Sequence, residues 1–184
     1  EKVKDKTVKT ENTKEISEQP KEKNNQLGKV IQKNEETQKN GWQLDSNGWR
    51  YYKKGQIVTK EWIFDTKEGT WYYLSESGEY VKNAWVTDYY LGSNGKMLVS
   101  QWLFDSSYNG WYYLTKSGAY ANATWVGDYY LKQYGKMADA EWIYDPNYQS
   151  WYYLNNGGSY ARSQWAGNYY LLADGKMAKK AWVD

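Results

Sequence analysis

Aromatic and apolar residues along 41–184 gather in short runs separated by polar turns, and the pattern recurs with a 40-residue step. One run begins with Trp and an aliphatic residue, as in Trp62-Ile63, and the next reads Trp-Tyr-Tyr-Leu, as in 71–74. Aromatic and β-branched residues favour strands, and a turn signal such as Asn109-Gly110 stands between paired runs. The pattern therefore predicts a series of β-hairpins.

The repeat divides into unequal halves. A long half of about 23 residues, as in 61–83, alternates with a short half of about 17, as in 84–100. A first unit occupies 41–60, so that seven hairpin units precede a C-terminal stub at 181–184. A lone hairpin is marginal in water, whereas stacked hairpins bury their faces against one another. We expect an all-β solenoid over 41–184, in one elongated body.

The first 40 residues differ in character. They contain no aromatic residue, and they hold ten Lys and eight acidic residues among Gln, Asn and Thr. Such a segment cannot bury enough apolar surface to offset the entropy of ordering its backbone. Residues 1–40 are therefore predicted to form a disordered N-terminal tether, with a short helix around Leu27, Val30 and Ile31 as the alternative.

Composition excludes several classes of function. The chain has 12 Trp and 21 Tyr but no His and no Cys, so it offers no Ser–His or Cys–His nucleophile, zinc finger or disulfide framework. A net charge of +2 does not indicate nucleic-acid binding, and no apolar run is long enough for a transmembrane segment. Asp65, Asp105 and Asp145 precede turns, where capping explains them, so we expect no enzyme, no cofactor and no metal site.

The aromatic rings themselves suggest a ligand. Side chains two apart on a strand share a face, so Trp71 and Tyr73 point one way and Tyr72 the other. A group of rings suits a quaternary ammonium, which has no N–H to donate but is attracted to the negative ring faces. The alternative is that the rings serve only as core. Because Trp carries an N–H that needs a partner, Phe or Leu would fill a core more simply.

The pattern of Gly-Trp, Trp-Tyr-Tyr and Gly-x-Met resembles the choline-binding repeat of pneumococcal-type surface proteins and phage lysins. The resemblance covers 41–184 and recurs in all seven units. It implies a left-handed β-solenoid in which choline sits between consecutive repeats, in a box of two Trp from one repeat and a Tyr from the next, often beside a Met. It also implies that the ligand is the phosphocholine of wall and membrane teichoic acids.

Transferred to this sequence, the resemblance implies four boxes. In the first, Tyr80 replaces the Met, and the second Tyr of each pair is chosen in every box by the face argument. The predicted site residues are Trp42, Trp49 and Tyr73; Trp62, Trp71, Tyr90 and Met97; Trp102, Trp111, Tyr130 and Met137; and Trp142, Trp151, Tyr170 and Met177.

The short units depart from the pattern. They carry Asp88, Asp128 and Asn168 where the second Trp belongs, so their junctions keep Trp85 with Tyr113 and Trp125 with Tyr153 but lack one wall. We interpret them as degenerate packing junctions, with altered choline sites as the alternative. The stub residue Trp182 suggests a homodimer through the C-terminal repeats.

The sequence thus predicts a secreted, non-catalytic protein held non-covalently on the bacterial wall. Each box alone should bind weakly, and repeated choline groups on one polymer should raise the affinity through avidity. The alternative function is a glucan- or polysaccharide-binding module, because related repeats share the Tyr-Tyr and Gly signature. An adhesin role, in which another face or the tether binds a host protein, is compatible with the first function.

Overall fold

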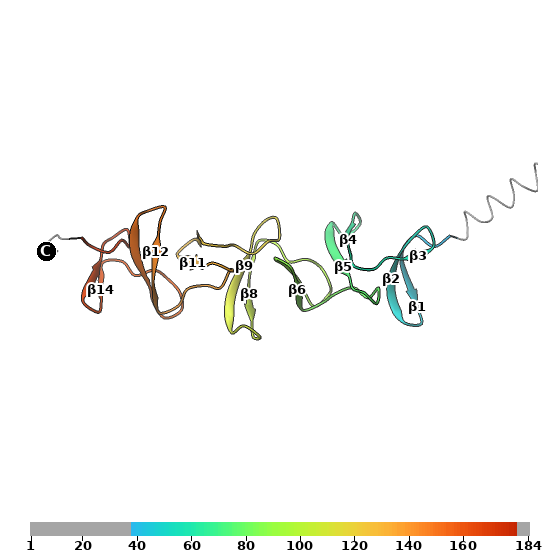
Figure 1. The fold of residues 1–184 in the computed structure, drawn as a ribbon, viewed down its shortest axis with the longest axis horizontal. Helices are drawn as coiled ribbons and strands as arrows, with labels where there is room; N and C mark the ends of the chain where they lie inside the picture. Colours follow the sequence, from blue (N-terminus) through green and yellow to red (C-terminus); the bar gives the residue numbers. More distant parts are fainter. Residues whose placement is uncertain (1–37, 180–184) are drawn as a thin grey trace, which may run out of the picture.

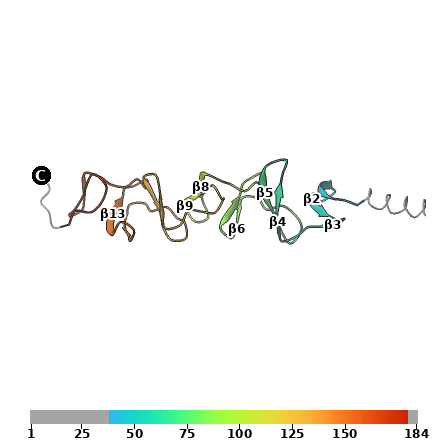
Figure 2. The same cartoon turned by 90° about the horizontal axis from the view of Figure 1, so that it is seen from above.

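The computed structural model describes residues 38–179, which form a slender rod in both perpendicular views (Figures 1 and 2). Residues 1–37 of the predicted tether and the stub with Trp182 lie outside the described residues. Within 38–179 the regular structure consists of strands and contains no helix. The all-β solenoid expected from the repeat is confirmed.

Seven antiparallel hairpins follow one another along the rod, as the repeat predicts. The first is β1 (Gly41–Asp45) with β2 (Gly48–Lys53), extended by β3 (Gln56–Ile57). The long hairpins are β4 (Glu61–Asp65) with β5 (Thr70–Leu74), β8 (Gln101–Asp105) with β9 (Gly110–Leu114), and β12 (Glu141–Asp145) with β13 (Ser150–Leu154). The short hairpins are β6 (Ala84–Val86) with β7 (Tyr89–Leu91), β10 (Thr124–Val126) with β11 (Tyr129–Leu131), and β14 (Gln164–Ala166) with β15 (Tyr169–Leu171).

Register places the aromatic residues in pairs across each hairpin. Trp62 lies opposite Tyr73, and Phe64 lies opposite Trp71. In the short hairpin β6–β7, Trp85 lies opposite Tyr90, and the strands end one pair further on. The long hairpins therefore carry one Trp position that the short hairpins have no strand residue to match.

The innermost side chains of the rod are leucines. Leu ends the second strand of each hairpin from β5 onward and is fully buried, with 0% exposure in every case: Leu74, Leu91, Leu114, Leu131, Leu154 and Leu171. Tyr52 is buried at the same position of the first hairpin. A leucine column therefore fills the axis, and aromatic rings pack around it, with Tyr112, Tyr130 and Tyr152 also buried.

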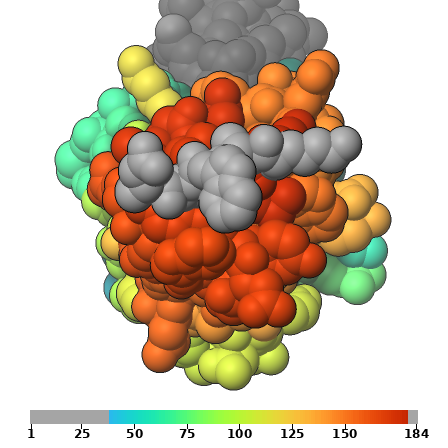
Figure 3. Space-filling view, turned by 90° about the vertical axis from the view of Figure 1, so that its left-hand side faces the viewer, coloured from blue at the N-terminus to red at the C-terminus, as the bar shows by residue number. Residues whose placement is uncertain are grey.

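Each turn from one hairpin to the next uses a residue with positive φ that is not glycine. Its N–H donates to a backbone carbonyl of the following unit, as Lys60 does to Ser75 at 3.2 Å and Ser100 to Thr115 at 3.0 Å. The turn recurs at Lys60, Asn83, Ser100, Ala123, Ala140 and Ser163, with φ between 48° and 51°. This repeated bend carries successive hairpins to different sides of the axis, as a view from the C-terminal end shows (Figure 3).

The first described residues pack against the first hairpin. The Lys39 carbonyl accepts the N–H of Gly55 at 2.8 Å, and the Asn40 side chain accepts that of Lys54 at 2.7 Å. The Lys39 ammonium lies 4.9 Å from the centre of the Tyr52 ring. Residues 38–40, which the sequence assigned to the tether, therefore form the edge of the repeat body.

Candidate functional site

The junctions between successive hairpins are of two kinds, which we name after one residue. A Met junction follows each long hairpin and includes Met97, Met137 or Met177. A Tyr junction follows the first or a short hairpin and includes Tyr80, Tyr120 or Tyr160. The two kinds alternate along the rod.

Two Met junctions enclose open hollows walled by aromatic rings. The hollow after β4–β5 measures about 320 Å³ and is lined by Trp62, Trp71, Tyr89, Met97 and Ser117. Its counterpart after β8–β9 measures about 380 Å³ and is lined by Trp102, Trp111, Tyr129, Met137 and Gly157. Neither lining includes a charged residue. Trp71 and Trp111 are 40% and 44% exposed, so both hollows can be reached from solvent.

Backbone contacts hold the methionine at its place in the junction. The Met97 N–H donates to the Trp71 carbonyl at 2.9 Å, so the two walls come from units that are hydrogen-bonded to each other. The Met97 side chain occupies space that a Cβ at Gly118 would invade, at 2.6 Å from Cε. Gly118 also has a φ of +91°, so a glycine is required there on both counts.

The choice of the second Tyr in each box is wrong. Tyr89, not Tyr90, faces Trp62, with ring centres 5.5 Å apart, while Tyr90 packs 5.1 Å from Trp85 in its own hairpin. Tyr90 shares a face with the Trp opposite it, and that face points toward the following unit. A residue that completes the preceding box must point backward, so it is the first Tyr of the pair.

The same correction holds at every box. Tyr129 and Tyr169 face Trp102 and Trp142, and Tyr72 faces Trp42, at 5.2–5.6 Å between ring centres. The residues named from the sequence pack instead within their own hairpins, at 5.0–5.3 Å: Tyr73 with Trp62, Tyr130 with Trp125, and Tyr170 with Trp165. The repeat spacing located each Tyr pair but could not show which direction each face took.

The third Met junction follows the same plan. Trp142 lies 5.6 Å from Tyr169, and the Met177 N–H donates to the Trp151 carbonyl at 2.9 Å. Tyr169 is 55% exposed, compared with the partly buried Tyr129 of the preceding Met junction. The structure therefore joins Met177 to Trp151 and Trp142 to Tyr169, as at the first two Met junctions.

Tyr junctions close a Trp between two tyrosine rings. Trp85 lies 5.2 Å from Tyr112 and 6.0 Å from Tyr120, and Trp125 has the same neighbours in Tyr152 and Tyr160. The expected partners Tyr113 and Tyr153 pack on Trp102 and Trp142 instead.

A buried carboxylate anchors the Trp of the Tyr junctions at Trp85 and Trp125. The Trp85 indole N–H donates to Asp105 at 2.7 Å, and Trp125 donates likewise to Asp145 at 2.7 Å. Asp105 and Asp145 are 8% and 2% exposed. These Asp residues therefore cap turns, as the sequence suggested, and also satisfy the indole N–H, which the sequence did not reveal.

The rims of the two junction types differ in charge. Each Tyr junction is flanked by a lysine from two units further along the chain, where it directly precedes the Met of that unit. These lysines are Lys96, Lys136 and Lys176. At the first two Met junctions the corresponding residue is Ala119 or Ser159, which pairs with Tyr89 or Tyr129 in an isolated bridge. An ammonium group therefore stands beside Tyr junctions and is replaced by a small side chain at Met junctions.

Turn geometry explains why the short units lack a second Trp. The N–H of Tyr120 donates to the Asp88 carbonyl at 3.0 Å, just as that of Met97 donates to Trp71, so Asp88 occupies the equivalent position. In the short hairpin this position lies in the two-residue loop Thr87-Asp88, where Asp and Asn are favoured. Asp128, in the next short hairpin, forms an ion pair with Arg162 at 3.1 Å.

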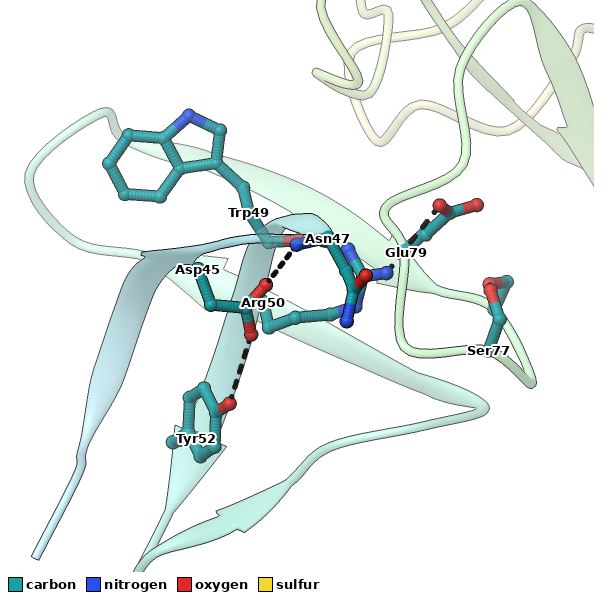
Figure 4. A network of polar contacts seen from close by, with 8 residues as sticks. Asp45, Asn47, Trp49, Arg50, Tyr52, Ser77 and Glu79 are labelled. Atoms are coloured by element: carbon teal, nitrogen blue, oxygen red, sulfur yellow. Dashed lines mark hydrogen bonds and ion pairs between the residues drawn. The ribbon is translucent and has the colours of Figure 1, made fainter.

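The first junction combines features of both types. Trp42 lies 5.2 Å from Tyr72 and 6.2 Å from Tyr80, and its indole N–H donates to Asp65 at 3.0 Å. Trp49 is 47% exposed, and its ring points away from the polar network below it (Figure 4).

That network ties the first unit to the second. The Arg50 guanidinium donates to the Trp49 carbonyl at 2.9 Å and pairs with Glu79 at 3.5 Å. Asp45 accepts the N–H of Asn47 at 2.8 Å and the hydroxyl of Tyr52 at 3.3 Å (Figure 4). At a Met junction the corresponding Trp carbonyl accepts the N–H of the Met, whereas here the Trp49 carbonyl accepts a hydrogen bond from Arg50.

Within residues 38–179, no group of three His, Cys, Asp or Glu residues is placed to hold a metal ion. The same part of the chain contains no helix that is long and apolar enough to cross a membrane.

Family models of known proteins match the repeat region of this chain. A family model described as a choline-binding repeat matches residues 79–120 and 159–184, and one described as a cell wall binding repeat matches 60–80. The comparison with curated proteins gave no match.

Solved structures give longer matches. The choline-binding domain of CbpL from Streptococcus pneumoniae is 48% identical, with a TM-score of 0.68 over 79% of this chain and 90% of that domain. Choline binding protein F from Streptococcus pneumoniae is 30% identical, with a TM-score of 0.56 over 79% of this chain. CbpJ from the same species is 28% identical, with a TM-score of 0.57 over 76% of this chain.

The chain spans 54% of choline binding protein F and 48% of CbpJ, so it matches about half of each of these larger structures. Its match to the CbpL domain covers most of both chains. The repeat pattern, the hairpin stack and this identity agree, and the chain belongs to the choline-binding family of cell wall binding repeat proteins.

Proposed function

We propose that the Met junctions bind the choline groups of wall and membrane teichoic acids and thereby hold the protein on the bacterial surface. The observation that carries this proposal is the pair of uncharged hollows, each walled by two Trp, a Tyr and a Met. Ring faces attract a trimethylammonium group by cation–π contact, at about 0.5–2 kcal/mol each. The proposal assigns no catalytic role to the described residues.

The ring arrangement fits the shape of the ligand. Trp62 and Trp71 come from one unit and Tyr89 from the next, so three ring surfaces meet around one space. Met97 supplies a polarisable fourth side that makes no demand for a hydrogen bond. A quaternary ammonium has no N–H donor, and this lining is suited to such a group.

Repeated weak sites favour a repeated ligand. Each hollow is open and should bind choline weakly, because few contacts must offset the lost motion of the ligand. Hairpins project on different sides of the rod, so one polymer would wind around it to reach successive sites (Figure 3). A polymer that engages a second site does so intramolecularly, and its affinity can rise by about 10²–10⁴.

A choline titration followed by tryptophan fluorescence tests this function. We expect saturation at millimolar choline, with no response to the uncharged analogue 3,3-dimethylbutanol, which has the same shape but no charge. Trp71→Ala and Trp111→Ala should each remove part of the signal and of the bound choline. Trp165→Ala, an exposed Trp outside any Met junction, is the matched control.

Dextran in the same titration tests the alternative function as a glucan-binding module. Stabilisation against heat by dextran but not by choline would overturn the choline proposal. A crystal soaked in choline would show directly which junctions are occupied, including the first one, at Trp42 and Trp49.

A further inference from the structure

The Tyr junction at Trp85 contains an aromatic hollow that the choline proposal does not use. It measures about 330 Å³, and its lining includes Trp85, Tyr108, Tyr112, Tyr120, Tyr134 and Lys136. Tyr108 and Tyr134 are 62% and 75% exposed, which is unusual for aromatic rings that have no binding role. Exposed rings around a hollow mark a binding surface.

Charge at this hollow disfavours choline. The Lys136 ammonium donates to the Tyr108 carbonyl at 3.2 Å, and within residues 38–179 no carboxylate forms an ion pair with it. Lys96, at the same position of the first junction, pairs with Glu68 at 2.6 Å. The acid is replaced by Tyr108 in the next repeat, so one change removes the counter-charge and adds a ring.

The nearby buried acid cannot replace that counter-charge at the rim. Asp105 is 8% exposed, and its oxygens accept the Trp85 indole N–H at 2.7 Å and the Ser107 N–H at 2.8 Å. An incoming ligand therefore meets the exposed Lys136 ammonium among several tyrosine rings and hydroxyls. Thr87 also lines the hollow, and its neighbour Asp88 is exposed in the same loop, at the wall of the junction rather than on the Tyr108, Tyr134 and Lys136 rim.

We propose that this junction binds a phosphorylated sugar unit of an anionic glycopolymer. The C–H groups of a sugar ring lie favourably against the negative faces of Tyr108 and Tyr134. Their hydroxyls can exchange hydrogen bonds with those of the sugar. Lys136 supplies a positive point charge for the phosphate. The site uses different residues from the Met junctions and so extends the proposed function.

The next Tyr junction provides an internal comparison. Around Trp125, Asp174 stands where Tyr134 stands in the preceding repeat, and it lies 3.7 Å from the Lys176 ammonium. The guanidinium of Arg162 lies 4.8 Å from the Tyr160 ring centre. This junction lacks one platform ring and partly neutralises its lysine, so it should bind the phosphorylated sugar more weakly.

Fluorine NMR of the full chain labelled with 5-fluorotryptophan tests the proposal, with single Trp→Phe variants at Trp62, Trp85, Trp102 and Trp125 to assign the four signals. Titration with glucose 1-phosphate should move the Trp85 signal saturably at millimolar concentration, and the Trp125 signal less. Lys136→Gln should weaken the Trp85 response by about tenfold. Lys96→Gln, the same change at the first junction, should leave it unchanged.

Three further outcomes would overturn the proposal. These are no saturable shift of Trp85, an equal shift with inorganic phosphate alone, or a response of Trp85 to choline as strong as that of Trp62. Choline added to the same sample reports on Trp62 and Trp102 separately, so a failure of the sugar site is distinguishable from a failure of the choline sites.

Discussion

Met and Tyr junctions are built on one backbone frame and differ in three side chains that a ligand can meet, besides the buried carboxylate that holds Trp85 or Trp125 in the Tyr junctions. Both stack a Trp against the first Tyr of the following unit, and both join the units through the same N–H to carbonyl contact, from Met97 to Trp71 or from Tyr120 to Asp88. The wall changes from Trp to Asp, Met changes to Tyr, and a small rim residue changes to Lys. The frame therefore sets the fold, and these three positions set what a junction can bind.

The difference also separates stability from recognition. In the Tyr junctions, Trp85 and Trp125 are each held by a buried carboxylate and two tyrosine rings. These Trp residues therefore support the fold as well as lining a hollow. In a Met junction Trp71 and Trp111 remain 40–44% exposed, supported on one side by Phe64 and Phe104. Met-junction rings should therefore be the easier ones to remove without unfolding the rod.

Removing two Met-junction walls together should have the largest effect. Trp71→Ala or Trp111→Ala alone should weaken retention on choline-bearing walls modestly. The double variant should lose about 10²–10⁴ in apparent affinity, because binding at several sites is no longer intramolecular. The measurement is retention on isolated walls, with elution by free choline, and Trp165→Ala serves as the control. Retention of the double variant at the level of the parent would refute avidity.

Removing the anchor of a Tyr junction should come next. Asp145→Ala leaves the N–H groups of Trp125 and Asn147, which donate to it at 2.7 and 2.8 Å, without their acceptor. We expect a loss of about 2–4 kcal/mol in the free energy of unfolding, measured in urea. Asp65→Ala, at a less buried copy of the position with a 3.0 Å contact, should cost less. Equal losses in the two variants would contradict the burial argument.

The positions of the functional rings could be predicted only in part. The 40-residue step predicted the paired Trp and the Met that line the hollows of the first two Met junctions, such as Trp62, Trp71 and Met97, because a repeat preserves position. It could not distinguish Tyr89 from Tyr90, since that choice depends on whether a hairpin face points to the preceding or the following unit. Alternation along a strand gives two faces but not their directions.

Other features could not be predicted from the repeat, for different physical reasons. The leucine column consists of the last residue of each Tyr-Tyr-Leu run, and its complete burial depends on how the hairpins stack, which composition does not show. Lys136 and Tyr134 at the Trp85 junction come from two units further along the chain. A contact between units that are not adjacent cannot be read from the spacing within one repeat.

Alkaline pH should weaken the Tyr junction at Trp125 in particular. Burial raises the pKa of the Tyr152 hydroxyl to about 12, with the carboxylates of Asp174 and Asp145 adding to the effect. The unfolded chain loses this proton first, at its ordinary pKa of about 10, so stability falls as pH rises from about 10 to 12. The decline from this group is at most about 2.7 kcal/mol, and below pH 10 its contribution is fully present.

Urea unfolding at several pH values between about 8 and 11.5 measures this decline. Tyr152→Phe should reduce the slope with pH, because the titrating hydroxyl is gone. Tyr144→Phe, which alters a ring that is 48% exposed on the neighbouring strand, is the matched control. An unchanged slope in Tyr152→Phe would show that other groups cause the alkaline loss.

The smallest expected effect tests the rim charge that separates the two junction types. Ala119 pairs with Tyr89 at the edge of the first Met junction, where Tyr junctions carry a lysine. Ala119→Lys should place an ammonium beside the Trp62 box and weaken choline binding there by about 0.2–1 kcal/mol, the range for partly exposed charges. High salt should reduce the loss, because such charges are screened.

Ala119→Gln has a long polar side chain without the charge, and it should retain the parent affinity if charge rather than bulk is responsible. A loss of the same size in both variants would mean that the lysines of the Tyr junctions act by filling space, and that the two kinds of junction are separated by shape alone.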